Sequence, residues 1–160
     1  MTTTIEKHTG DLLENVKEGL IVHGCNAQGV MGAGIALAVR NRYPEAFEVY
    51  HNKYLEDGLL LGTITYYRAR PSMNGREPLI VVNAVTQDGF GRDKRYVDYP
   101  AVRRCFKEVA ALARVTDVSA VHFPLIGCGL AGGEWSVIEP IIEETLDGLQ
   151  AHLWVLPASK

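Results

Sequence analysis

Apolar runs alternate with helix-like segments along the whole chain, and this alternation most constrains the fold. The run 79–85 is apolar on both faces, as expected of a strand in the middle of a sheet. We expect strands at 20–22, 61–67, 79–85, 119–126 and 152–156, and helices at 34–42, 44–57, 97–114 and 135–149. Strands interleaved with helices predict the α/β class, with a largely parallel sheet covered on both faces. Ligands of such sheets bind at the carboxyl ends of the strands.

Composition limits the kind of protein that this chain can be. Its 160 residues, 47% of them hydrophobic and 22% charged, fit one globular domain over 1–160 with a sizeable core. The 19 acidic residues outnumber the 16 basic ones, and a net charge of −3 argues against strong binding to nucleic acid. No apolar run approaches the length of about 20 residues that spans a bilayer, so we expect no membrane partner.

The cysteines and the first residues bear on the compartment. Cys25, Cys105 and Cys128 are an odd number at wide spacings, which fits no disulfide framework. Residues 1–8 form neither the basic nor the apolar part of a signal peptide. We therefore expect a cytoplasmic protein, and we expect it to be a monomer.

Two glycine-rich loops stand out, and each follows an expected strand and precedes an expected helix. The first, 23–36, reads HGCNAQGVMGAGIA, and the second, 124–135, reads PLIGCGLAGGEW. Glycine accepts positive φ angles and lets a ligand approach the backbone closely. Backbone N–H groups at the start of a helix bind phosphate without a basic side chain. Two such loops in one small domain predict a cleft that holds a diphosphate from two sides.

The second loop also contains Gly-x-Gly-x-x-Gly at 127–132, which is part of a dinucleotide-binding motif. The complete motif needs an acidic residue at the end of the next strand, and the expected strand 152–156 ends without one. The Gly-Lys-Ser/Thr of a P-loop is also missing from the sequence. A zinc site made of His23, Cys25 and Cys128 lacks the usual ligand spacing, so we predict no metal and no cofactor.

Three side chains of the first loop are candidates for chemistry. His23 follows the expected strand 20–22, so its side chain can project into the cleft; the other interpretation is a hydrogen-bonded core histidine. Asn26 can bond sugar hydroxyls or simply cap the loop. Cys25 fits a buried, inert thiol better than a nucleophile, because the only polarising neighbour in the sequence is His23.

A polar segment, 86–99, follows the expected central strand and can fold over the same cleft. Its glycines and its three aromatic residues, Phe90, Tyr96 and Tyr99, fit a lid that stacks on a base or a sugar. A solvated surface loop is the alternative interpretation of its charges.

Four blocks of the sequence together resemble a macrodomain. They read KHTGDL at 7–12, HGCN at 23–26, GVMGAGIA at 29–36 and PLIGCGLAGGEW at 124–135, and they occur in family order over nearly the whole chain. The resemblance implies a three-layer α/β/α fold with a mostly parallel mixed central sheet. It also implies binding of ADP-ribose or ADP-ribose-1″-phosphate.

The resemblance assigns the binding residues by position. Asp11 is expected to take the adenine amino group and Asn26 the distal ribose, while the two glycine loops wrap the diphosphate. The full set of substrate-binding residues implied in this way is Asp11, Leu12, Asn26, Gly29, Met31, Gly32, Gly34, Ile35, Ile126, Gly127, Cys128, Gly129, Leu130, Ala131 and Gly132.

Within the family, the chain looks most like members that hydrolyse ADP-ribose-1″-phosphate. Those members use a histidine where His23 stands, together with an acid from the loop after the central strand, which here is Asp93 or Asp88. We predict His23 and Asp93 as the catalytic pair, with His23 acting as acid or base. The expected products are ADP-ribose and phosphate.

Two alternative functions remain open at this point. The chain can be a non-catalytic module that binds ADP-ribose, or an ADP-ribosyl hydrolase that acts on modified protein or nucleic acid. The second alternative resembles members with a lysine soon after the central strand and, in some, an acid in the second glycine loop. Here those positions hold Thr86-Gln87 and Ala131, which argues against a lysine route.

Overall fold

A computed structural model of the protein describes residues 2–91, 93–128 and 131–157. Its strands are β1 (Ile5–Thr9), β2 (Gly19–Asn26), β3 (Ile64–Arg70), β4 (Leu79–Gln87), β5 (Ala120–Phe123) and β6 (Gln150–Val155). Its helices are α1 (Leu12–Asn15), α2 (Gly34–Arg42), α3 (Pro44–Asp57), α4 (Tyr99–Val115) and α5 (Trp135–Thr145). The six strands form one sheet in the order β1-β6-β5-β2-β4-β3.

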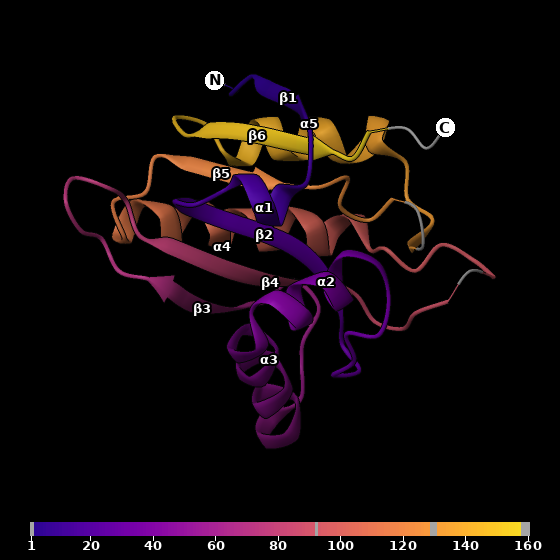
Figure 1. The fold of residues 1–160 in the computed structure, drawn as a ribbon. Coiled ribbons are helices and arrows are strands. Elements are labelled where there is room, and N and C mark those ends of the chain that lie inside the picture. Colours follow the sequence, from indigo (N-terminus) through magenta and orange to yellow (C-terminus); the bar gives the residue numbers. More distant parts are fainter. Residues whose placement is uncertain (1, 92, 129–130, 158–160) are drawn as a thin grey trace.

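The sheet is mixed but mostly parallel, as the sequence predicted. Only the edge strand β3 runs antiparallel to its neighbour, β4. Helices α4 and α5 lie behind the sheet, while α1 and α2 lie in front of it and α3 extends below (Figure 1). The α/β class and the three-layer arrangement are therefore confirmed.

Alternate residues of the central strands enter different layers of the core. In β2, Leu20 and Val22 join the cluster formed with α4 and α5, whereas Ile21 joins the cluster formed with α1, α2 and α3. The strand β4 repeats this alternation, and its residues from Leu79 to Thr86 are all buried. Apolar side chains on both faces are what a central parallel strand requires.

Two elements at the start of the chain are absent from the sequence prediction. The strand β1 lies at the sheet edge and contains exposed and half-buried residues, and α1 has a single turn. Asp11 begins α1, because its Oδ1 accepts hydrogen bonds from the backbone N–H groups of Leu13 (2.9 Å) and Glu14 (3.2 Å). This is the usual role of aspartate at an N-cap.

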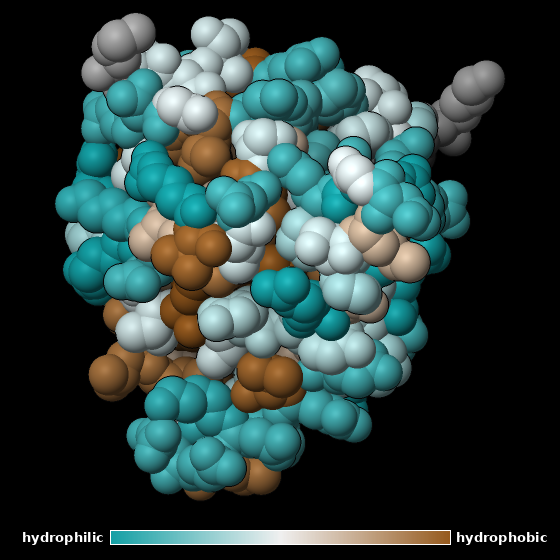
Figure 2. Space-filling view, turned by 90° about the vertical axis from the view of Figure 1, so that its left-hand side faces the viewer, coloured by the Kyte–Doolittle hydropathy of each residue, from teal (hydrophilic) through white to brown (hydrophobic). Residues whose placement is uncertain are grey.

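The parallel strands end on one side of the molecule. The opposite side, where these strands begin, shows a narrow band of hydrophobic residues between hydrophilic ones (Figure 2). Among the described residues, no helix is both long and apolar enough to cross a membrane.

Candidate functional site

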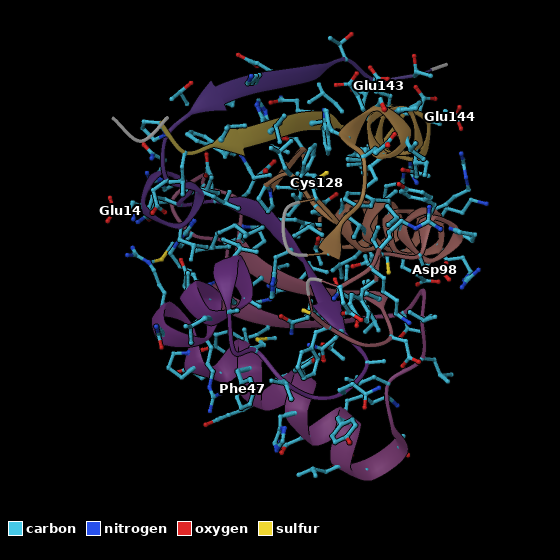
Figure 3. The ribbon with its side chains drawn as sticks, turned by 90° about the vertical axis from the view of Figure 1, so that its right-hand side faces the viewer. Glu14, Phe47, Asp98, Cys128, Glu143 and Glu144 are labelled. Atoms are coloured by element: carbon cyan, nitrogen blue, oxygen red, sulfur yellow. The ribbon has the colours of Figure 1, made fainter. Side chains whose placement is uncertain are left out.

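A cavity of about 460 Å³ opens at the carboxyl ends of β2 and β4. This volume lies in the range of small-molecule sites. Its lining consists of residues 24–26, Val30, 32–36, Gln87, Phe90, Gly91, 125–128 and Ala131. Figure 3 views this end of the molecule, with Cys128 near the centre of the face. Both glycine loops and the start of the polar segment after β4 therefore meet at one cavity, as the sequence predicted.

The first turn of α2 forms one wall of this cavity. Ala33 is the N-cap and carries no side chain that can accept a hydrogen bond from the helix. Ala33, Gly34, Ile35 and Ala36 all line the cavity. The first N–H groups of a helix have no partner within the helix, so those of α2 are available to an anion in the cavity.

The second glycine loop closes on itself behind the cavity. Gly133 donates its N–H to the carbonyl oxygen of Gly127 at 2.6 Å. A Cβ on Gly127 would lie 2.6 Å from Val97 Cγ2, and φ of Gly127 is +75°. Both constraints demand glycine for packing, in addition to any demand made by a ligand.

Asn26 holds the first glycine loop together. Its Oδ1 accepts hydrogen bonds from the N–H of Gln28 (2.9 Å) and the hydroxyl of Tyr50 (2.8 Å), and its Nδ2 donates to the carbonyl of Val30 (2.8 Å). The same hydroxyl of Tyr50 lies 2.6 Å from the carbonyl oxygen of Asn26, and burial raises the pKa of Tyr50. Of the two roles predicted for Asn26, capping of the loop is therefore observed, and its side chain also lines the cavity.

His23 does not end its strand, and this corrects the sequence prediction. The strand β2 continues three residues further, to Asn26, and the His23 side chain is fully buried. Its Nε2 lies 2.6 Å from Oδ1 of Asn83. His23 is not among the residues that line the cavity. The catalytic role assigned to it by resemblance stays a prediction, but the side chain does not project into the cleft.

The partners of Asn83 determine which nitrogen of His23 carries the proton. Asn83 Nδ2 donates to the carbonyl of Ala46 (3.0 Å) and to Oγ1 of Thr65 (3.1 Å), so its Oδ1 is the acceptor that faces His23. The N–H of His23 is therefore on Nε2, and Sγ of Cys25 lies 3.7 Å from each of the two ring nitrogens. Burial lowers the pKa of His23 to about 4, only partly offset by the bond to Asn83.

Cys25 lies between His23 and the cavity, but its thiol is not activated. Burial raises the pKa of Cys25 well above its ordinary value, and a nearby thiol, Cys105, raises it further. A thiolate is the reactive form of cysteine, so this environment favours an inert thiol.

The acids of the polar segment after β4 lie at the rim. Asp88 Oδ1 accepts a hydrogen bond from Gln28 Nε2 at 3.0 Å, which ties the segment to the first glycine loop. Asp93 Oδ1 accepts from the Tyr96 hydroxyl at 2.5 Å, and this bond lowers the pKa of Asp93. Asp93 also lies against Gly91, a cavity residue, because a Cβ on Gly91 would be 3.0 Å from its Oδ1.

The predicted binding residues fall into three groups. Those that line the cavity are Asn26, Gly32, Gly34, Ile35, Ile126, Gly127, Cys128 and Ala131. Those that do not line it are Asp11, Leu12, Gly29, Met31 and Gly132. Gly129 and Leu130 lie outside the described residues.

The residues that do not line the cavity have structural roles instead. Leu12 and Met31 are buried in hydrophobic clusters, and Asp11 caps α1. Gly29 has φ of +77°, and a Cβ there would lie 2.6 Å from the Tyr54 ring. Gly132 has φ of +76° and packs against the backbone of Arg95. In these five positions the motif serves the fold, and the binding roles implied by resemblance stay predictions.

The sequence analysis left several lining residues out of the predicted set. Gly24, Cys25, Val30 and Ala33 belong to the first loop, and Leu125 belongs to the second. Gln87, Phe90 and Gly91 come from the segment after β4. The sequence indicated that this segment lies over the cleft only through its glycines and aromatic residues.

Comparison with known proteins identifies the family. The family model described as Macro domain matches residues 22–142. The chain belongs to the macrodomain family. The glycine loops, the cavity and the start of α2 all lie within the matched part.

Two relatives of this macrodomain show the range of the family. A DNA ADP-ribosyl glycohydrolase of Thermus aquaticus is 27% identical over 147 residues, which cover 91% of this chain but only 39% of that protein. An ADP-ribose 1″-phosphate phosphatase of Meyerozyma guilliermondii is 27% identical over 157 residues, covering 84% of this chain and 90% of that protein. A solved structure of a Bacteroides thetaiotaomicron protein of unknown function superposes with a TM-score of 0.81 at 32% identity, covering 97% of this chain and 99% of that one.

The hydrogen bonds of Tyr50 yield a first prediction. Tyr50→Phe removes the hydroxyl that holds Asn26, and we expect the free energy of unfolding to fall by about 1–3 kcal/mol, because buried acceptors lose their partner. Tyr54→Phe is the matched control, because Tyr54 lies on the same helix but is more exposed. It should change the free energy of unfolding by less than about 0.5 kcal/mol. Equal effects in denaturant unfolding would show that the Tyr50 hydroxyl does not stabilise the loop.

The buried His23 yields a second prediction. Because its pKa is about 4 in the folded protein against 6.5 ordinarily, the unfolded chain binds more protons between these values. Stability therefore falls as the pH drops. His23 contributes about 2 kcal/mol to this loss between pH 7 and pH 5. His23→Gln keeps a donor for Asn83. Its free energy of unfolding, measured in urea at pH 7 and pH 5, should therefore fall less between these two pH values than that of the wild type. An identical pH dependence in both proteins contradicts the assignment.

Proposed function

We propose that the protein binds ADP-ribose in this cavity and hydrolyses ADP-ribose-1″-phosphate to ADP-ribose and phosphate. The observation that carries the proposal is the start of α2, where four consecutive residues, 33–36, line the cavity and the N-cap is alanine. The oxygens of a diphosphate placed there accept hydrogen bonds from the free N–H groups of the helix. The names of the Thermus and Meyerozyma relatives both refer to derivatives of ADP-ribose, which supports this ligand class.

The cavity offers different surroundings to different parts of such a ligand. Apolar groups from Val30, Ile35, Phe90 and Ile126 line it together with the backbone of the glycine loops. Phe90 is 56% exposed and stands on the segment after β4. An exposed aromatic ring at the rim suits stacking on a base or a sugar.

We assign the proton-transfer step to Asp93. In hydrolysis the oxygen of water bonds to phosphorus, and the bond from phosphorus to the 1″ oxygen breaks. A carboxylate can accept the proton of the attacking water, and the departing 1″ oxygen takes a proton from solvent. Asp93 is exposed beside the cavity residue Gly91, and its lowered pKa keeps it ionised at neutral pH. His23 is less suited, because its side chain is fully buried and does not line the cavity.

The structure also bears on the alternative of an ADP-ribosyl hydrolase that uses a lysine. Thr86 and Gln87 stand where such members carry that lysine; Thr86 is fully buried within β4, and Ala131, at the position of the acid, is 7% exposed. Gln87 is the residue of β4 that reaches the cavity. These observations argue against a lysine route for removal of ADP-ribose from protein or DNA.

We further propose that the protein acts as a cytoplasmic monomer. All three of its cysteines are free thiols, and two of them are buried, which fits a reducing compartment. Gel filtration with light scattering tests the oligomeric state, and a dimer would contradict this part of the proposal.

A charge placed in the cavity tests the binding site. Gly32 lines the cavity, and a Cβ on it meets only Val30 Cγ1 at 3.5 Å, so a side chain fits there without strain. We expect Gly32→Glu to weaken ADP-ribose binding by about 100-fold, because its carboxylate repels the diphosphate. Gly32→Gln has the same size without the charge and should bind markedly better than the glutamate variant. Calorimetry that shows equal affinity for both variants would place the diphosphate elsewhere.

Phosphate release from ADP-ribose-1″-phosphate tests the chemistry. We expect Asp93→Asn to lower kcat by about 100-fold with little change in ADP-ribose affinity, as is typical of a lost general base. Asp88→Asn, which changes the neighbouring acid, should retain kcat within about threefold.

Other outcomes of the same assay distinguish the alternatives. A wild-type protein that binds ADP-ribose but releases no phosphate is a binding module. Release of ADP-ribose from modified DNA or protein, without phosphatase activity, identifies an ADP-ribosyl hydrolase. A His23→Gln variant that loses about 100-fold in kcat, yet keeps its ADP-ribose affinity and unfolding free energy, would return proton transfer to His23.

A further inference from the structure

We propose that Glu6, His8 and His152 form a binding site for a divalent transition metal ion such as Zn²⁺. The site lies at the edge of the sheet that is formed by β1, on the strand pair of β1 and β6. None of the three residues lines the cavity described above, and the inference is independent of the proposed function.

The register of the two strands brings these side chains together. In the parallel pair of β1 and β6, Glu6 lies opposite His152 and His8 lies opposite Trp154. Alternate residues of a strand point to the same face, so Glu6 and His8 share one face of β1. In Figure 1, β1 and β6 lie at the top of the sheet, far from α2.

The distances between the ligand atoms suit one small ion. His8 Nε2 donates a hydrogen bond to His152 Nδ1 at 2.9 Å, and His152 Nδ1 lies 3.6 Å from Glu6 Oε2. Binding of an ion by both nitrogens requires the His8 proton to move from Nε2 to Nδ1. All three atoms lie within 4.8 Å of one another. Ligand atoms bound tetrahedrally to zinc, with bonds of about 2.0–2.2 Å, are about 3.3 Å apart. Small rotations are enough to reach that arrangement, and the Glu6 side chain, 67% exposed, is free to make them.

The nitrogen of His152 that faces the proposed ion carries a lone pair. His152 Nε2 lies 3.2 Å from Gln150 Oε1, which accepts its N–H and leaves Nδ1 unprotonated. Histidine ligands of metals usually donate their second N–H to such an acceptor.

Both imidazole rings are held in place before any ion binds. His8 stacks on Trp154 with ring centroids 4.4 Å apart, and His152 stacks on His122 at 4.8 Å. The indole N–H of Trp154 donates to Nδ1 of His122 at 3.0 Å, which links the two supporting rings. A site whose ligands are already oriented loses less conformational entropy on binding.

The donor set and its access favour zinc-like ions. Two imidazoles and one carboxylate suit Zn²⁺ and its neighbours in the transition series, whereas Mg²⁺ and Ca²⁺ prefer oxygen ligands alone. A hollow lined by His122, Gln150, His152 and Trp154, among others, opens beside the cluster. It leaves room for water as the fourth ligand of a tetrahedral ion. The sequence analysis predicts no metal, because His8 and His152 are 144 residues apart and form no local motif.

Titration of the metal-free protein with ZnCl₂ in a calorimeter tests the proposal. We expect one Zn²⁺ per chain, with a rise in thermal midpoint that EDTA reverses. His8→Gln and His152→Gln should weaken binding by about 100-fold or more. Glu6→Gln, which replaces a charged ligand by a neutral one, should weaken binding by about tenfold or more. Gln150→Ala should weaken it by about tenfold, the lower end of the effect seen for residues that orient a metal ligand.

Matched variants separate this site from other ligands in the chain. His51→Gln, on α3, and Cys128→Ser, in the second glycine loop, should bind Zn²⁺ as tightly as the wild type. Circular dichroism shows whether His152→Gln folds; the exposed Glu6→Gln gives a readout if it does not. Absence of binding at millimolar Zn²⁺ would overturn the proposal, as would wild-type affinity in both His8→Gln and Glu6→Gln. Unchanged ADP-ribose affinity in Glu6→Gln is expected, because the two sites lie apart.

Discussion

The pairing of β2 with β4 determines where the first glycine loop and the segment after β4 lie. The point at which the register of this pair changes matters most. The two strands pair residue for residue from Gly19 and Leu79 up to Cys25 and Val85, and then Asn26 pairs with Gln87. The shift leaves Thr86 out of the ladder, and a register shift of this kind bends a strand locally. The two strands then lead directly into the first glycine loop and the segment after β4, which are hydrogen-bonded to each other and both line the cavity.

The register change is accompanied by an unpaired polar group, the hydroxyl of Thr86, which is fully buried and has no hydrogen-bond partner among the described residues. Thr86 sits where a Cβ on Gly24 would come within 2.8 Å of its Oγ1. The glycine in His-Gly-Cys-Asn is thus explained by the side chain of a neighbouring strand. An unpaired buried hydroxyl is tolerated near functional sites more often than in an ordinary core.

The sequence predicted the layers of the fold well and the details of the site unevenly. Helical periodicity predicted α2 and α3 at their observed bounds, because Pro44 ends the first helix and begins the second, and Gly58 ends the second. The polar His23 suggested an early end to β2, but Asn83 of the next strand satisfies that histidine within the sheet. Such long-range pairing leaves no trace in local composition. The same limit hid β1, whose charged residues resemble a loop until β6 is placed beside them.

The strand order has a consequence for how the chain assembles. The first described strand, β1, pairs with β6, the last one, and with no other strand of the described chain. Its backbone therefore lacks this partner until residues 150–155 have been synthesised and have joined the sheet. Contacts of such large sequence separation form late, because the intervening chain must first become ordered. The cavity end of β2 and β4 does not share this delay, so the binding loops can take shape while the opposite edge of the sheet is still open.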